Sequence, residues 1–398
     1  HAVANINWSS LYHIESCEDM VTCFYATIKA LIDAYLPLCK FKRHSSDKPW
    51  VTDRFRLLIR RRQFAFNSGN VTDYKRCRNA VQRLGRKLRT KYYNKQVSRL
   101  RQSNPRKWWK NVKHFVGLNR STDNDELSGL ASTRYDGDIG RMADDINNFF
   151  LNVASDTPPL SDDILKSVSD RADSRAHDDG DDDAFIIYPW EVEQKLSQVC
   201  TYKASGPDEL PNWFLKEMAP FIAEPVCAIF NASIRQGHVP NLWKQANIVP
   251  VPKVAPPKSV ENDLRPISLT ATLSKVLESF VGGWILHAVG HKLDKNQYGV
   301  LKQRSTSHAL VSALHHWSTA LDSGNSVRTL FVDYSKAFDR VDHNVLLYKM
   351  INIGIPEPIV NWLFSFLKGR KQRVKLGNCY SRWVELTGGM PQGTWLGP

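Results

Sequence analysis

One segment carries the chain's excess of positive charge and limits how it can fold. Residues 42–113 contain 23 Lys and Arg against three Asp and no Glu. This local balance of +20 exceeds the formal net charge of +14 for all 398 residues, so the remainder is net acidic. Charges of one sign at this density repel one another and are not buried without partners. The segment therefore predicts solvent-facing helices with only a narrow apolar seam.

Two helices are predicted within this basic segment. The stretches FRLLIRRRQFAF (55–66) and DYKRCRNAVQRLGRKLRTKYYNKQVSRL (73–100) carry apolar side chains at helical spacing, and NSGNVT separates them. A merely solvated helix face usually mixes both signs of charge for i,i+4 pairing, whereas acids are almost absent here. We therefore predict a salt-sensitive, largely sequence-independent contact with nucleic-acid phosphates. The candidate residues are Arg60, Arg61, Arg62, Arg83, Arg86, Lys87, Arg89, Lys91, Trp108 and Trp109.

The two tryptophans of PRKWWK (105–110) leave two interpretations open. Beside three cations they could stack on bases, or they could pack in a core. Upstream, MVTCFYATIKALIDAYL (20–36) repeats apolar residues at helical spacing up to Pro37, which predicts a packing helix. Residues 161–183 contain nine Asp and few apolar residues, which predicts a flexible acidic linker rather than a calcium loop.

The cysteine pattern and the hydropathy indicate in which cellular compartment the protein acts. The seven cysteines form no C-x-x-C pair, so they indicate reduced thiols of an intracellular protein rather than a zinc site or a disulfide framework. No apolar run approaches the roughly 18–20 residues that span a bilayer, which predicts a soluble protein with no membrane partner. The chain begins at His1 and stops at GGMPQGTWLGP, so we expect a piece of a longer protein.

After Ala184 the pattern is that of an α+β fold. Helical stretches such as WFLKEMAPFIAEPVCAIFNASI (213–234) alternate with short β-type runs such as ANIVPVPK (246–253) and RVKLG (373–377). The stretch LRPIS (264–268) is assigned to a turn because of its proline.

Three aspartates stand close together in LFVDYSKAFDRVDH (330–343). TLFVDYS (329–335) is predicted to form a buried strand whose end carries Asp333, and Asp342 is predicted to cap the helix HNVLLYKMINI (343–353), which ends at Gly354. A carboxylate at a strand end suits Mg²⁺, which takes oxygen ligands from one or two carboxylates and substrate phosphates. Asp339 is expected to have a local structural role, and His343 to be exposed.

Several motifs, in order, resemble the reverse transcriptases of non-LTR (LINE-like) retrotransposons of the jockey and CR1 type. KASGPDELPNWFLK, GHVPNLWKQANIVPVPK, LRPISLTATLSKVLESFV and QYGVLKQRSTSHAL are similar to the family's finger motifs. FVDYSKAFDRVDH resembles its palm motif A, and GMPQGTWLGP its motif B. The family's GFR is GVL here, and its usual Ser-Val after PQG is Thr394-Trp395, a bulkier pair expected to alter packing behind the nucleotide pocket.

The resemblance implies roles for individual residues. Asp333 would be the catalytic metal ligand, with the backbone carbonyl of Tyr334 helping to hold Mg²⁺ of a two-metal site. Phe338 would exclude a 2′-hydroxyl and so select deoxynucleotides, although by itself it could be a core aromatic. The triphosphate would be bound by Arg265 and Lys253, although Arg265 could equally be a surface residue of a polar loop. The nascent base pair would be lined by Gln392 and Gly393.

The same resemblance implies a domain order and partners. It predicts a basic helical linker (1–115), a variable acidic region (116–183), right-hand polymerase fingers (184–325) and a partial palm (326–398). The partners would be an RNA template, a DNA primer or target, and dNTPs, with action in the nucleus after assembly with RNA in the cytoplasm. The family also implies an endonuclease in the complete protein.

The remaining catalytic carboxylates are expected outside these 398 residues. The family carries them in a Y/F-A-D-D turn after motif B, and the only A-D-D here lies in MADD (142–145), which is predicted to be helical surface. The chain alone is therefore expected not to polymerise. Two alternatives stay open: a non-catalytic nucleic-acid-binding remnant or domesticated protein, and an RNA-templated RNA polymerase, against which Phe338 argues.

Overall fold

The described residues form two compact units. The computed structural model describes residues 2–36, 48, 50–100, 108, 127–154, 156–164, 185–254, 256–299 and 301–397. The smaller unit lies within Pro37–Thr122, and the larger one combines His1–Leu36 with Asp123–Pro398. The N-terminal helices therefore pack with the C-terminal part of the chain, while the boundaries at residues 115 and 183 stay predictions.

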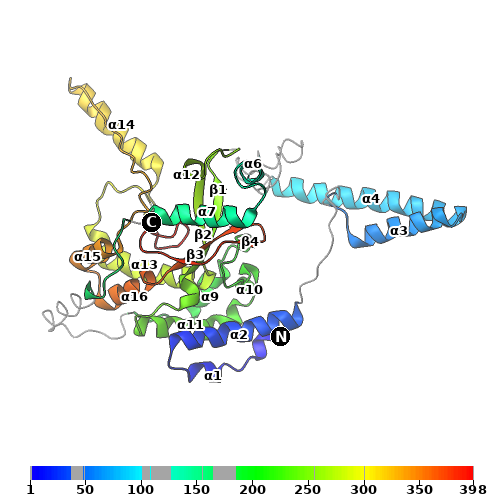
Figure 1. Ribbon diagram of the computed structural model, residues 1–398, viewed down its shortest axis with the longest axis horizontal. Helices are drawn as coiled ribbons and strands as arrows, with labels where there is room; N and C mark the ends of the chain where they lie inside the picture. Colours follow the sequence, from blue (N-terminus) through cyan, green and yellow to red (C-terminus); the bar gives the residue numbers. More distant parts are fainter. Residues whose placement is uncertain are drawn as a thin grey trace. The chain divides into compact units, whose positions relative to one another are not determined.

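Helices dominate both units (Figure 1). The smaller unit contains α3 (Asp53–Asn67) and α4 (Val71–Leu100). The helices of the larger unit are η1 (Val3–Asn5), α1 (Ser9–Tyr12), α2 (Cys17–Tyr35), α6 (Ser128–Arg134), α7 (Ile139–Asn152), α9 (Pro189–Ser197), α10 (Asn212–Glu217), α11 (Ala219–Arg235), η2 (Asn241–Lys244), α12 (Val260–Asp263), α13 (Thr272–Val289), η3 (Gly290–Lys292), α14 (Thr306–Asp322), α15 (His343–Ile353) and α16 (Glu357–Leu367).

A small mixed sheet lies at the centre of the larger unit. Its strands are β1 (Gln245–Pro252), β2 (Leu264–Leu269), β3 (Lys371–Leu376), β4 (Cys379–Tyr380) and β5 (Val384–Glu385). Strand β1 pairs antiparallel with β2 and parallel with β3, and β4 and β5 both pair antiparallel with β3. The combination of helices with a mixed sheet is that of an α+β fold, as predicted.

Two apolar cores hold the larger unit together. The smaller core joins α6, α7 and α12 to the sheet, where Met142 and Ile146 of α7 meet Ile248 of β1 and Val374 of β3. Figure 1 shows α7 lying across the sheet. The larger core joins α1, α2, α9, α10, α11, α13, α15 and α16. MADD is helical as predicted and lies in α7, but the prediction that it is surface is wrong for Met142 and Ala143, which are buried in this core, whereas Asp145 is exposed.

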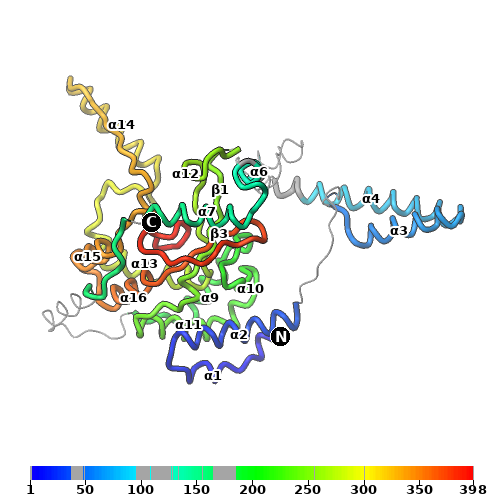
Figure 2. Tube along the Cα trace, in the orientation of Figure 1, coloured from blue at the N-terminus to red at the C-terminus, as the bar shows by residue number. Residues whose placement is uncertain are grey.

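The predicted strand at 329–335 is wrong. Residues 325–334 have no regular secondary structure, and Leu330, Phe331 and Val332 are 85%, 83% and 65% exposed. Figure 2 traces the chain out through α14 and back through this segment. A strand needs a neighbouring strand for its backbone hydrogen bonds, and in the described part of the chain none pairs with this run. Helix α14 likewise buries no residue.

The turn predicted at LRPIS is also wrong, because residues 264–269 form strand β2. Pro266 lacks an N–H, yet it fits because β2 is an edge strand and Pro266 lies opposite Pro250 of β1. Other local predictions are confirmed. The packing helix predicted over residues 20–36 is α2 (Cys17–Tyr35). Helix α15 follows its predicted cap Asp342, whose carboxylate accepts from the amides of Asn344 and Val345.

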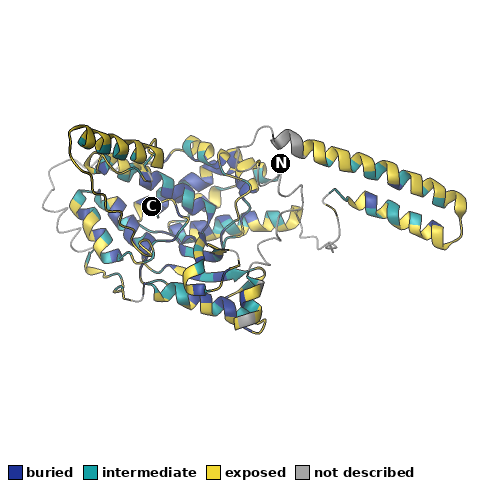
Figure 3. Cartoon of the chain, turned by 90° about the horizontal axis from the view of Figure 1, so that it is seen from above, coloured by how far each residue is buried: buried dark blue, intermediate teal, exposed yellow. Residues whose placement is uncertain are grey.

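The smaller unit is a helical hairpin, as the basic segment predicts. Most of its residues are exposed, as the yellow colour of the hairpin in Figure 3 shows. Phe55 of α3 packs against Gly85 of α4, where an added Cβ would lie 3.2 Å from the ring. Among the described residues of both units, no helix is long and apolar enough to cross a membrane. The six described cysteines are free thiols.

Candidate active site and nucleic-acid interface

The second half of motif A and motif B are joined by backbone and side-chain hydrogen bonds. The amide of Met390 donates to the carbonyl of Phe338, and that of Gly389 to the carbonyl of Val341, both at 2.8 Å. His343 Nε2 lies 2.8 Å from the carbonyl oxygen of Gly389. Residues 338–343 and 389–392 therefore form one docked pair of segments, although some 50 residues separate them in the chain.

Asp339 and Gln392 form the polar contact at the centre of this pair. Gln392 Nε2 donates to Asp339 Oδ1 at 2.8 Å. Burial raises the pKa of the Asp339 carboxyl, while the hydrogen bond from Gln392 and the charges of Lys336 and Lys253 oppose that rise. The local structural role predicted for Asp339 thus takes a specific form: it orients the amide of Gln392.

Strand β2 holds the backbone next to this amide. The Ser268 amide donates to the carbonyl of Gln392 at 2.8 Å. Gly393 has φ +125°, and an added Cβ would lie 2.9 Å from the Ser268 carbonyl oxygen. A side chain at position 393 would therefore be strained by the backbone conformation and would clash with β2. Glycine is required here by both conditions.

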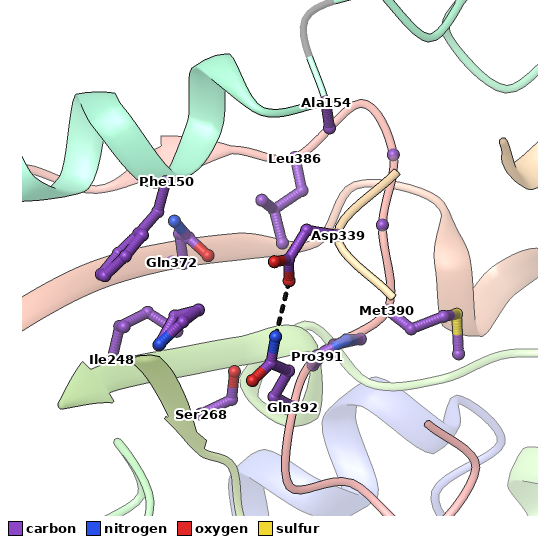
Figure 4. A pocket seen from close by; sticks show the side chains of 13 residues that line it. Phe150, Ala154, Ile248, Ser268, Asp339, Gln372, Leu386, Met390, Pro391 and Gln392 are labelled. Atoms are coloured by element: carbon purple, nitrogen blue, oxygen red, sulfur yellow. Dashed lines mark hydrogen bonds between the residues drawn. The ribbon is translucent and has the colours of Figure 1, made fainter. Parts of the chain in front are cut away.

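A small cavity marks where these elements meet (Figure 4). Its lining includes Ser268 of β2, Gln372 of β3, Phe150 of α7, Asp339 and Gln392. Gln372 Nε2 donates to Asn147 Oδ1 of α7, which fixes one wall. The volume of about 40 Å³ is far below the roughly 300–1,000 Å³ of ligand pockets. The cavity as it stands can hold a few waters, so these residues form part of a pocket at most.

His343 contradicts the prediction that it is exposed. Its side chain is 1% exposed, and because a carbonyl can only accept, Nε2 carries the hydrogen that Gly389 receives. Burial lowers the pKa of this imidazole, and the nearby Arg370 guanidinium lowers it further. The sequence position beside a helix cap gave no sign of this contact, because the partner lies 46 residues further on.

Asp333, Tyr334 and Phe338 lie apart from the cavity lining. Tyr334 is 79% and Phe338 48% exposed, and Asp333 is also exposed in the irregular segment. Across the described ranges no three His, Cys, Asp or Glu side chains converge to hold a metal. Asp333 thus belongs to no such cluster of described side chains, and its role as a metal ligand stays a prediction.

The two predicted phosphate-binding cations are placed differently. Arg265 of β2 lies opposite Val251 and is exposed, whereas its neighbours Pro266 and Ser268 line the cavity. Alternation along the strand therefore directs Arg265 away from the cavity. Lys253 Nζ donates to the Asn262 carbonyl at 2.8 Å, and its charge acts on Asp339. Of the two cations, Lys253 is therefore the one whose charge acts on Asp339.

The α3–α4 hairpin presents a groove with an apolar floor and cationic sides. Leu57, Leu58 and Ala80 contribute apolar lining. The cations along the groove are Arg54, Arg60, Arg61, Arg76, Arg83 and Lys87. Four of these were predicted as nucleic-acid ligands, whereas Arg54 and Arg76 were not, because only the helix–helix packing places them at the groove.

The other predicted ligands of this interface lie elsewhere. The side chains of Arg86, Arg89 and Lys91 are exposed on α4, and Arg62 is partly exposed on α3. Trp108 is 40% exposed. The prediction for Trp109 lies outside the described residues. The candidate interface therefore consists of the groove and these further exposed cations of the hairpin.

Comparison with known proteins connects the motif A–motif B site to a family. The family described as reverse transcriptase (RNA-dependent DNA polymerase) matches residues 251–398, which contain β2, Phe338–His343 and Gly389–Gly393. The chain is 30% identical over 210 residues to the probable RNA-directed DNA polymerase from transposon BS of Drosophila melanogaster, covering 52% of this chain and 23% of that protein.

Two further relatives give the same result. The probable RNA-directed DNA polymerase from transposon X-element of Drosophila melanogaster is 31% identical over 212 residues, which cover 53% of this chain and 23% of the relative. The RNA-directed DNA polymerase from mobile element jockey of Drosophila funebris is 31% identical over 210 residues, which cover 52% and 23%. The chain thus spans less than a quarter of these relatives.

Proposed function

We propose that the chain is the polymerase region of a non-LTR retrotransposon protein, because residues 251–398 match the family described as reverse transcriptase. In the complete protein it would add dNTPs to a primer 3′-hydroxyl on an RNA template. The observation that carries the proposal is the docking of Phe338–His343 on Gly389–Gln392, because it brings two motifs of the family together. Right-hand fingers and palm are the architecture that this function implies.

We assign the reacting end of the site to residues 333–338. Reverse transcriptases generally use divalent metal ions, which would activate the primer oxygen and stabilise the leaving pyrophosphate. Asp333 is the proposed carboxylate ligand and the Tyr334 carbonyl its neighbour. Phe338 would discriminate against a 2′-hydroxyl. The chain itself links these residues to the rest of the site, because Asp333 precedes Asp339, which contacts Gln392, by six residues.

The nucleotide-facing residues are assigned from the cavity. The Gln392 side chain, oriented by Asp339, and the backbone of Gly393 would contact the nascent base pair. Lys253 lies near Asp339 and would bind the triphosphate as a point charge. Arg265 is proposed as the second phosphate ligand from the family match alone, because its exposed side chain lies on the face of β2 away from the cavity.

Primer extension tests the proposal. The 398-residue chain, incubated with oligo(dT)-primed poly(rA), Mg²⁺ and dTTP, should bind the template but add no nucleotide. A longer protein in which the jockey relative's segment after motif B follows Pro398 should extend the primer. Asp333→Ala in that protein should abolish extension while template binding stays within twofold. Asp322→Ala, an exposed residue in α14, is the matched control. Full extension by the Asp333→Ala protein would refute the assignment.

A second candidate function is non-catalytic nucleic-acid binding, and the α3–α4 groove favours it. Six cations along one groove would bind phosphates whether or not polymerisation occurs. We propose action in the nucleus for both candidates. If the longer protein does not extend primers while the chain binds RNA with strong salt dependence, the binding function stands and the polymerase proposal does not.

A further inference from the structure

Helix α13 contacts the segment that follows Gln392 through a buried carboxylate. Glu278 is 0% exposed, and its Oε2 accepts from the Trp395 amide at 2.7 Å and the Leu396 amide at 3.4 Å. Its Oε1 accepts from Ser274 Oγ at 3.0 Å. A buried carboxylate is tolerated only with such donors, so α13 and residues 395–396 depend on each other.

Two cations, buried Arg370 and half-buried Lys275, interact electrostatically with Glu278. The carboxylate's charge raises the pKa of both Arg370 and Lys275, opposing the effect of burial on these cations. Arg370 is 1% exposed, and its Nε and Nη2 have no hydrogen-bond partner in the described structure. Glu278 therefore offsets part of the positive charge of Arg370 and Lys275, and its loss would leave that charge less balanced.

One helical turn beyond Glu278, Gly282 makes room for Trp395. A Cβ on Gly282 would lie 1.7 Å from Trp395 Cζ3 and 2.5 Å from Cε3, so the indole ring occupies the space that any side chain at 282 would fill. Gly282 has an ordinary helical backbone, so this close approach is what requires glycine here. The bulky Trp395 ring thus fits against α13 because residue 282 has no side chain.

We infer that Glu278 and Gly282 are positioning residues for the turn that carries Gln392 and Gly393. Glu278 fixes the backbone of residues 395–396, and Gly282 receives the Trp395 ring, so α13 holds the turn from one side. Strand β2 and Asp339 hold it from the other. This inference rests on the proposed function only for its consequence, that the held turn presents Gln392 and Gly393 to a nucleotide.

Hydrogen exchange followed by mass spectrometry on the 398-residue chain tests the Glu278 contact. Glu278→Ala should speed exchange of the Trp395 and Leu396 amides about tenfold or more, because hydrogen bonds to a charged group contribute more than neutral ones. Glu278→Gln keeps an acceptor oxygen and should give a smaller change. Glu193→Gln, which removes a charge from an exposed position on α9, is the control and should change nothing. Wild-type exchange at 395–396 in folded Glu278→Ala would overturn the inference.

A double-mutant cycle tests the Gly282 contact separately. Gly282→Ala should displace Trp395 and speed exchange throughout peptides covering 389–397. Adding Trp395→Val should restore slow exchange, a rescue that general loss of stability would not give. If the double variant exchanges as fast as Gly282→Ala, the contact does not position the turn.

The consequence for function has its own readout. Primed template with dTTP should slow exchange in peptides 389–397 of the wild-type chain, and Glu278→Ala should lose this effect. A turn that is protected by Glu278 but unaffected by dTTP would contradict the proposed nucleotide role and leave the positioning contact intact. If the exchange and rescue tests fail while dTTP still protects the turn, the positioning contact is contradicted and the proposed nucleotide role is left intact.

Discussion

His343 offers the most direct test of how motif A is held against motif B. Its imidazole is 1% exposed and donates from Nε2 to the Gly389 carbonyl at 2.8 Å. His343→Ala removes a buried ring and leaves that carbonyl without its partner. Truncating a buried side chain costs about 2–4 kcal/mol, and an unsatisfied buried acceptor adds about 1 kcal/mol or more. We expect a total loss of about 3–5 kcal/mol in the free energy of unfolding, a large part of the roughly 5–15 kcal/mol typical of a domain.

The pH dependence gives the same contact a second signature. Burial lowers the pKa of His343 below its usual 6.5, so the unfolded chain binds more protons than the folded one between the folded pKa and 6.5. The stability from the neutral imidazole is therefore fully present above about pH 6.5 and falls as pH decreases toward the folded pKa. The slope from one group is at most about 1.4 kcal/mol per pH unit.

Urea unfolding at several pH values between about 5 and 8 measures both effects. His343→Gln retains a donor at a similar reach and should lose less stability than His343→Ala, and it should remove this part of the acid sensitivity. His287→Gln, at an exposed position on α13, is the control for the general effect of losing a histidine. The reasoning fails if His343→Gln keeps the wild-type pH slope, or if His343→Ala costs less than about 1 kcal/mol.

Two further predictions address the N-terminal packing and the basic hairpin. Tyr25 donates to Asp208 Oδ2 at 3.0 Å, and burial raises the pKa of Asp208 to about 6, so Asp208→Asn should stabilise the fold on the order of 1–3 kcal/mol at pH 7. That gain should vanish below about pH 4 in urea titrations; a gain independent of pH would contradict it. Arg61→Glu with Arg76→Glu should weaken RNA binding and reduce the slope of log K against log salt by about one per lost phosphate contact. Lys29→Glu on α2 is the matched control, and an equal effect from it would exclude a specific groove.

Features set by near neighbours in the sequence were predictable. Helix α15 begins at Asp342 and ends at Gly354, which adopts φ +93°, because capping side chains and left-handed glycines act within a few residues. Helices α2, α3 and α4 follow from apolar spacing in the same way, and β1 and β3 from short β-type runs. The residues that cause each of these features lie within the same short stretch of sequence, so a single sequence is enough to predict them.

Features that depend on distant partners were not predictable from pattern alone. LFVDY has the composition of a buried strand, but composition supplies no hydrogen-bonding neighbour, and the segment is exposed. LRPIS has the composition of a turn, yet it forms an edge strand because it pairs with β1. The same reason governs the site: Asp339 meets Gln392 from 53 residues away, and Glu278 meets Trp395 from 117. Motif identity could name Gln392, but only the packing of β2, α13 and residues 338–343 shows what holds it. Substitutions at those supporting positions should therefore disturb Gln392 as effectively as substitutions beside it.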